Sequence, residues 1–143
     1  MALLNENDED FVRVKFNEAD SKYFMNNISN IKEDINRLLI WFVLKDQVLK
    51  GTTSSQVFLE SLFKAIDSRN PKSEKNMGIY EILTDLIYLM INTYTPKEFY
   101  EKQSLKMFDI LAHSTNSILE DGDPNGLLVV NLSCLLYFVR NAK

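Results

Sequence analysis

The chain is poor in the residues that hydrolytic and metal-dependent sites require. It holds one histidine, His113, and one cysteine, Cys134. A catalytic zinc site needs three protein ligands, and His113 has neither an adjacent glutamate nor a second histidine at helical spacing. A nucleophilic serine or cysteine needs a positioned base, and His113 is not recognisably paired with one. We therefore expect no catalytic residue, no metal ligand and no cofactor in this chain, and we interpret His113 as structural.

Glycine, long apolar runs and excess positive charge are scarce too. The four glycines each lie near a predicted helix boundary, so no glycine-rich phosphate loop is present. No run approaches the ~18 to 20 apolar residues that a transmembrane helix needs. The formal net charge of −4 gives no general attraction to nucleic acid or to an anionic membrane. We therefore expect a protein that binds neither nucleic acid nor membrane. The single cysteine excludes an intramolecular disulfide and fits a reducing compartment, so we expect the protein to be cytoplasmic.

What the sequence does contain predicts an all-α fold. Its 143 residues suit one domain with a real core, and 45% hydrophobic and 25% charged residues are typical of a globular protein. From Asp20 onward, apolar residues recur at intervals of three and four, the helical period. About six helices are expected, over about 20–27, from 30–34 to 51, 54–67, 76–93, 95–119 and 124–141, with a loop at 68–76.

Start and stop signals mark most of these helices. Asp20 is expected to cap the first, Gly51 to stop the second, and Ser54 or Ser55 to cap the third. Thr95, Pro96 and Glu98 form a predicted capping box, and Asp123 with Pro124 repeats the cap-and-proline pattern. The core-facing stripes are expected at Ile35, Leu38, Leu39, Phe42 and Leu49; at Phe58, Leu62, Phe63 and Ile66; and at Ile79, Leu83, Leu86, Ile87 and Met90.

One short strand and an array of helix pairs complete the predicted architecture. Phe11–Phe16 alternates apolar and polar residues, and a lone strand must find its partners in another part of a parent protein, in another copy or in water. Consecutive helices with short loops favour an antiparallel αα-hairpin array of the HEAT-like or solenoid kind. The last helix is apolar nearly all round and must be covered on several sides.

Arg37 and Trp41 lie one helical turn apart and are the candidate functional pair. The guanidinium can stack on the indole while Trp41 packs inward. One interpretation is a structural pair that ties the helix to its neighbour. The other is a contribution to a substrate-facing cavity wall, and both stay open at this point.

Three segments carry a resemblance to a known family. They are the acidic turn and strand of Leu3–Phe16, the helix Arg37–Gly51, and the turn Asp123–Leu128 before the last helix. This order resembles the start of the C-terminal helical domain of the aminopeptidase N, or puromycin-sensitive-type, family of zinc aminopeptidases. The arginine, the tryptophan four positions on, Asp46 and the glycine before a serine cap are similar to the family pattern, with Gln47 where a methionine is common.

The resemblance implies a non-catalytic domain of a larger metallopeptidase. Residues 1–17 would complete a small β-domain of the parent, and residues 18–143 would form the first part of the helical C-terminal domain. That domain caps the active-site cavity of a hydrolase that removes N-terminal residues from peptides, with zinc in the parent's catalytic domain. The implied partners are the upstream catalytic and β-domains and the peptide substrate, so this chain alone should be inactive.

A second hypothesis is a self-standing helical adaptor that binds a protein or peptide in a groove between helices. In either case, apolar surfaces left exposed would favour self-association.

Overall fold

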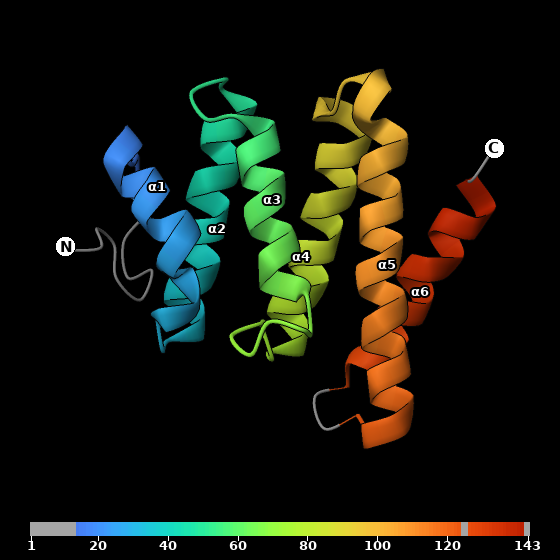
Figure 1. The fold of residues 1–143 in the computed structure, drawn as a ribbon. Coiled ribbons are helices and arrows are strands. Elements are labelled where there is room, and N and C mark those ends of the chain that lie inside the picture. Colours follow the sequence, from blue (N-terminus) through green and yellow to red (C-terminus); the bar gives the residue numbers. More distant parts are fainter. Residues whose placement is uncertain (1–13, 124–125, 142–143) are drawn as a thin grey trace. The chain divides into compact units, whose positions relative to one another are not determined.

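The structure is all-α. It is a computed structural model that describes residues 14–123 and 126–141, and within these ranges it contains six α-helices and no strand (Figure 1). A 3₁₀ turn, η2 (Ile28–Asn30), follows the first helix, and a π-helical segment, η3 (Met90–Tyr94), follows the fourth. The all-α prediction is confirmed. The α-helices are α1 (Glu18–Asn27), α2 (Asp34–Leu49), α3 (Ser55–Ile66), α4 (Met77–Leu89), α5 (Lys97–Asp121) and α6 (Leu127–Asn141).

The chain divides into two compact units, Met1–Ser61 and Leu62–Lys143, with the boundary inside α3. Each is described by itself. The strand predicted at Phe11–Phe16 is described only in part, because residues 11–13 lie outside the described residues. Val14–Phe16 are neither helix nor strand. The predicted domains 1–17 and 18–143 therefore stay a prediction. No helix of the described part has both the length and the apolarity that spanning a membrane requires.

In the first unit, α1 begins earlier than its expected cap. The Asn17 side chain accepts a hydrogen bond of 2.8 Å from the backbone N–H of Asp20, so Asn17 is the cap and Asp20 lies in the first turn. Asparagine is among the best N-cap residues, and an aspartate in the first turn interacts favourably with the positive end of the helix dipole. The expectation that Asp20 caps this helix was wrong by three residues.

The face of α2 that packs inward differs from the predicted one. Ile40, Trp41 and Leu44 are almost fully buried, whereas Ile35, Phe42 and Leu49 of the predicted stripe are exposed. Apolar residues surround α2 nearly all round, so the helical period alone could not choose its core face. The position of Trp41 decides it, because the indole packs on the buried ring of Phe58 of α3, with ring centroids 6.0 Å apart.

The turn from α2 to α3 follows its predicted signals. Gly51 ends the helix with φ +69°, a left-handed conformation that glycine adopts without steric cost. Ser54 accepts a hydrogen bond from the N–H of Val57 at 3.5 Å, so it is the cap of α3. The four predicted core residues of α3 are buried, as expected: Phe58, Leu62, Phe63 and Ile66.

The second unit holds α4, η3, α5 and α6. Asn76 caps α4 by accepting from the N–H of Ile79 at 3.1 Å, and every residue of the predicted α4 stripe is buried. The predicted capping box of the next helix is wrong. The Thr95 hydroxyl donates backward to the Met90 carbonyl at 3.0 Å, Pro96 occupies the cap position, and no side chain caps α5.

The start of α6 is held by Asp123, as predicted. Its carboxylate accepts from the N–H groups of Leu127 and Leu128 at 2.8 and 2.9 Å. The helix nevertheless begins at Leu127, three residues later than expected, while Pro124 lies outside the described residues. α6 packs on α5 and also contacts α4 (Figure 1), and its buried residues include Leu127, Asn131 and Cys134.

Candidate binding site

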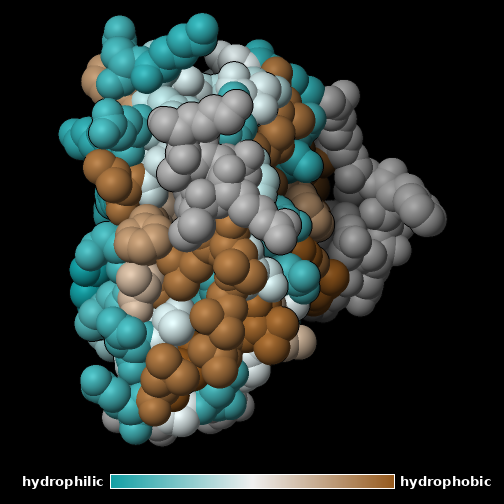
Figure 2. Space-filling model, turned by 90° about the vertical axis from the view of Figure 1, so that its right-hand side faces the viewer, coloured by the Kyte–Doolittle hydropathy of each residue, from teal (hydrophilic) through white to brown (hydrophobic). Residues whose placement is uncertain are grey.

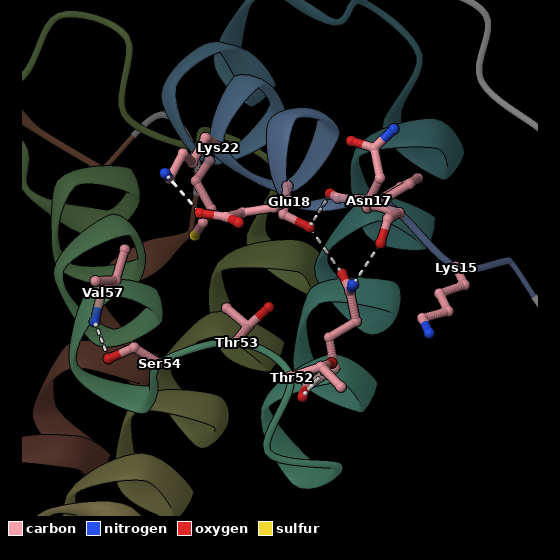
Figure 3. A pocket seen from close by; sticks show the side chains of 12 residues that line it. Lys15, Asn17, Glu18, Lys22, Thr52, Thr53, Ser54 and Val57 are labelled. Atoms are coloured by element: carbon pink, nitrogen blue, oxygen red, sulfur yellow. Dashed lines mark hydrogen bonds and ion pairs between the residues drawn. The ribbon is translucent and has the colours of Figure 1, made fainter.

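A cavity of about 500 Å³ opens in the first unit, a size within the range of small-ligand pockets (Figure 3). It lies where the non-helical lead-in segment, residues 14–17, meets the first turns of α1, the end of α2 and the turn into α3. Its lining is Lys15, Phe16, Asn17, Glu18, Ser21, Lys22, Met25, Gln47, Thr52, Thr53, Ser54 and Val57.

One buried side chain, that of Gln47, joins the walls of the cavity. Its Nε2 donates to the backbone carbonyl of Phe16 at 2.7 Å, and its Oε1 accepts from the Ser21 hydroxyl at 3.1 Å. The backbone carbonyl of Gln47 also accepts from both the N–H and the hydroxyl of Thr52, at 2.9 and 3.0 Å. A single residue of α2 thus holds the lead-in segment, α1 and the turn into α3 at fixed separations.

Apolar packing holds the lead-in segment from its other side. Val14 and Phe16 are buried, whereas Lys15 between them is exposed. The Phe16 ring packs against that of Phe24 in α1, with centroids 4.6 Å apart. The alternation of inward and outward side chains is that of an extended chain with one face on a core.

The rim of the cavity is charged and exposed. Lys22 donates to the Glu18 carboxylate at 2.8 Å across one turn of α1 (Figure 3). This hydrogen bond holds the pKa of the Glu18 carboxyl below its ordinary value and raises the pKa of Lys22. On the opposite wall, Ser54 and Thr53 present hydroxyl groups.

The lining holds one acid and two lysines. Glu18 is its only acid, and it is engaged by Lys22 in solvent; no histidine or cysteine is present in the lining. Across residues 14–123 and 126–141, no group of three histidine, cysteine, aspartate or glutamate side chains could hold a metal ion. The cavity can accept a ligand through hydroxyls, backbone groups and apolar carbons, but it offers no paired acid and base for proton transfer.

The candidate pair Arg37 and Trp41 lies away from this cavity, and neither residue lines it. The Arg37 guanidinium donates to the carbonyls of Ile31 and Lys32 at 3.0 and 2.8 Å and pairs with Asp34 at 2.6 Å. It therefore fixes the segment that leads into α2. Trp41 is a core residue, and the contribution of either one to a substrate-facing wall stays a prediction.

The two residues with reactive side chains lie in the second unit. His113 is exposed on α5. Cys134 is buried, and burial raises the pKa of its thiol, which keeps the reactive thiolate scarce. The phenol of Tyr88 donates to the backbone carbonyl of Cys134 at 2.8 Å.

Sequence reasoning did not single out the residues that build the cavity. Ser21 and Gln47 lie 26 positions apart, and Phe16 and Gln47 lie 31 apart, so only tertiary packing brings them together. The one available signal was Gln47 itself, an amide within the apolar stretch of α2.

Comparisons with known proteins identify no relative: no family model, no curated protein and no solved structure matches this chain.

Proposed function

We propose that this chain is a non-catalytic helical domain of a zinc aminopeptidase, which caps the active-site cavity and shapes peptide access. Its parent removes N-terminal residues from peptides in the cytoplasm, and the zinc belongs to the parent's catalytic domain. In this proposal the helices form an antiparallel αα-hairpin array. The lead-in segment continues a strand of the preceding β-domain.

The observation that carries the proposal is the anchored lead-in segment. Phe16 is fixed by its ring against Phe24 and by its carbonyl on Gln47, so the chain just ahead of α1 has a defined position on the unit. A domain that must hold its place over a neighbour needs such a joint, because a loose linker would let it drift. An adaptor that folds alone has no such requirement.

The family resemblance adds a second support. The residues that carry the resemblance have these places in the chain: Arg37 lies near the start of α2, Trp41 is buried, Gly51 ends the helix in a left-handed conformation and Ser54 caps the next helix. The structural role of each of these four residues explains its residue type. A helical domain of the same kind would need these residue types for the same structural reasons.

The role assigned to this chain is shape and water exclusion. Closing a cavity over a reacting centre removes bulk water and restricts which substrates enter. In this proposal the bond-breaking chemistry belongs to the parent's other domains.

The proposal is tested by an aminopeptidase assay with chromogenic aminoacyl substrates and added zinc. The chain is assayed alone, the parent's upstream catalytic and β-domains are assayed alone, and the two are assayed as a mixture. We expect no activity from the chain alone and a restored or altered rate on mixing. An unchanged rate, with no complex between the two, would count against the proposal.

Two phenylalanine variants sharpen this assay. Phe16→Ala removes the anchor of the lead-in segment, and we expect it to weaken the effect of mixing by roughly tenfold or more, because the chain ahead of α1 then loses its fixed position on the unit. Phe42→Ala removes a ring that is 43% exposed on α2 and serves as the control. Equal behaviour of the two variants would contradict the assigned role of the joint.

The alternative function, a helical protein- or peptide-binding adaptor, is favoured by a different observation. Ile35, Phe42 and Leu49 expose apolar side chains along α2 at helical spacing. Such a stripe suits an amphipathic partner helix. In the mixing experiment, a folded chain that has no effect on the upstream domains, while Phe42→Ala abolishes its binding to a helical peptide, would favour the adaptor.

A further inference from the structure

Helix α6 packs inward through the less apolar of two opposite sides. Its inner stripe consists of the buried residues Leu127, Asn131 and Cys134. The opposite stripe consists of Val129, Leu132 and Leu136, which are 73%, 45% and 60% exposed. Figure 2 shows hydrophobic residues gathered on the side of the molecule where α6 lies. Burial of apolar surface alone would favour the opposite orientation, in which α6 is rotated by about half a turn about its axis.

A polar contact at the centre of the inner stripe accompanies the observed orientation. Asn131 of α6 is 0% exposed. Its side-chain carbonyl accepts a hydrogen bond of 2.8 Å from the Tyr80 hydroxyl of α4, and its amide donates one of 3.0 Å to the Ser114 hydroxyl of α5. Tyr80 and Ser114 are also buried. One side chain of α6 thus binds a buried polar group on each of the two helices that α6 contacts.

We propose that Asn131 selects which side of α6 packs against α4 and α5. Rotating α6 so that Leu132 and its stripe face inward would bury more apolar surface. The same rotation would deprive the buried hydroxyls of Tyr80 and Ser114 of the Asn131 amide. A buried polar group that loses its partner costs free energy, so the polar contact opposes the rotation. The inference goes beyond the proposed function and does not rest on it.

Other contacts of α6 discriminate less between its sides. Asp123 accepts from backbone N–H groups at the start of the helix, and Tyr88 donates to the backbone carbonyl of Cys134. Every residue of a helix carries these backbone groups, whereas only Asn131 brings an amide side chain to the inner stripe. In coiled coils, a single buried asparagine selects one helix arrangement over others that would bury apolar surface equally well. We assign the same role to Asn131.

The test removes the three polar groups together. The triple variant Tyr80→Phe, Ser114→Ala and Asn131→Leu takes away both hydroxyls and the amide, so none of them is left buried without the others and the fold should be kept. The matched control is Asn92→Leu with Tyr100→Phe. In the second unit, the Tyr100 hydroxyl donates to the Asn92 side chain at 3.2 Å, but this contact is exposed. Circular dichroism measures the helix content of both variants.

Two thiol reporters show which side of α6 faces inward. One is the native Cys134 of the inner stripe. The other is Val129→Cys on the opposite stripe, introduced together with Cys134→Ser. The rate of reaction with a chromogenic disulfide reagent is measured for each reporter in the otherwise unchanged chain, in the triple variant and in the control. A buried thiol reacts slowly because the reagent must wait for the structure to open locally.

We expect the two reporters to change in opposite directions. In the triple variant, Cys134 should react at least about tenfold faster and Val129→Cys at least about tenfold slower than in the otherwise unchanged chain. The control should change neither rate. This reciprocal change would support a rotation of α6, because a helix that only loosens would expose both thiols.

Four results would overturn the proposal. Unchanged rates in the triple variant would show that Asn131 does not select the side. Faster reaction of both reporters would show that α6 loosens without rotating. Loss of helix content would show that the contact is needed for folding and not for the choice of orientation. The same rate changes in the control would show that the effect is not specific to Asn131.

Discussion

The side-chain amide of Gln47 donates to the backbone carbonyl of Phe16 across a 2.7 Å hydrogen bond. The two residues are 31 positions apart, one in α2 and the other in the segment before α1. A methionine of similar length would fill the space without supplying the donor. The lead-in segment of this chain is thus held by a polar contact.

Replacing Gln47 should destabilise the first unit. Gln47→Ala leaves the Phe16 carbonyl without its donor and opens a void, so we expect a loss of about 2–4 kcal/mol in unfolding free energy. Gln47→Met keeps the volume and should lose about 1–2 kcal/mol. Urea unfolding followed by the fluorescence of Trp41, the only tryptophan, reports on this unit. The exposed Gln56 of α3 supplies the control, since Gln56→Ala should change little; an equal effect of Gln47→Ala and Gln56→Ala would refute the assigned contact.

Two phenylalanines distinguish the buried from the exposed face of the first unit. Phe58 is fully buried against Trp41, and Phe58→Ala should cost about 3–5 kcal/mol and shift the Trp41 emission. Phe42→Ala should cost less than about 1 kcal/mol because its ring is 43% exposed. The same urea titration measures both. A larger loss of unfolding free energy in Phe42→Ala than in Phe58→Ala would show that the face of α2 predicted from periodicity is the buried one.

Tyr80 should make stability fall at high pH. Its phenol donates to the Asn131 side chain at 2.8 Å, and burial raises its pKa from 10.0 to about 12. The unfolded chain then loses this proton near pH 10, whereas the folded chain keeps it until about pH 12. The contribution is therefore complete below pH 10 and is lost as pH rises toward 12, with a magnitude of about 3 kcal/mol.

Comparison with Tyr80→Phe isolates this effect, because other groups that titrate at high pH are common to both proteins. Urea unfolding at several pH values gives the difference in unfolding free energy. We expect that difference to shrink as pH rises above 10. A difference that stays constant with pH would show that the phenol ionises equally in both states.

Cys134 should react slowly in the folded protein. Its thiol is buried and its pKa is raised by burial, so a chromogenic disulfide reagent should react roughly a hundredfold more slowly than with the unfolded chain. Moving the thiol by one position, in Cys134→Ser with Ser133→Cys, places it on the exposed side of α6 and should restore fast reaction. Equal rates for the two proteins would contradict the burial.

Much of the fold could be predicted because local signals decide it. Gly51, Ser54, Asn76 and Asp123 act through backbone groups within a few residues, so the helix ends they fix are visible in the sequence. The stripe of α4 is strongly one-sided and was predicted correctly.

The errors arise where local signals compete. The Thr95 hydroxyl had two possible roles, to cap α5 or to bond the Met90 carbonyl of η3, and it takes the second. α2 has apolar residues on every side, and the packing of Trp41 on Phe58 selects its inner face. No local pattern contains that information.

The candidate site was beyond prediction for a related reason. Gln47, Ser21 and Phe16 meet only after α1 has packed on α2, and none of them carries a recognisable motif. Arg37 and Trp41 were singled out because their spacing is visible in the sequence, and their contacts lie away from the cavity.

The assigned role in peptide access is tested most directly by the length dependence of hydrolysis. The ratio of kcat/KM for a long peptide to that for a chromogenic amino acid is measured for the parent's upstream domains, with and without this chain. A cap that restricts entry should change this ratio at least about tenfold, because the cost of entry falls on long substrates alone. A chain that binds the upstream domains and leaves the ratio unchanged would contradict the account.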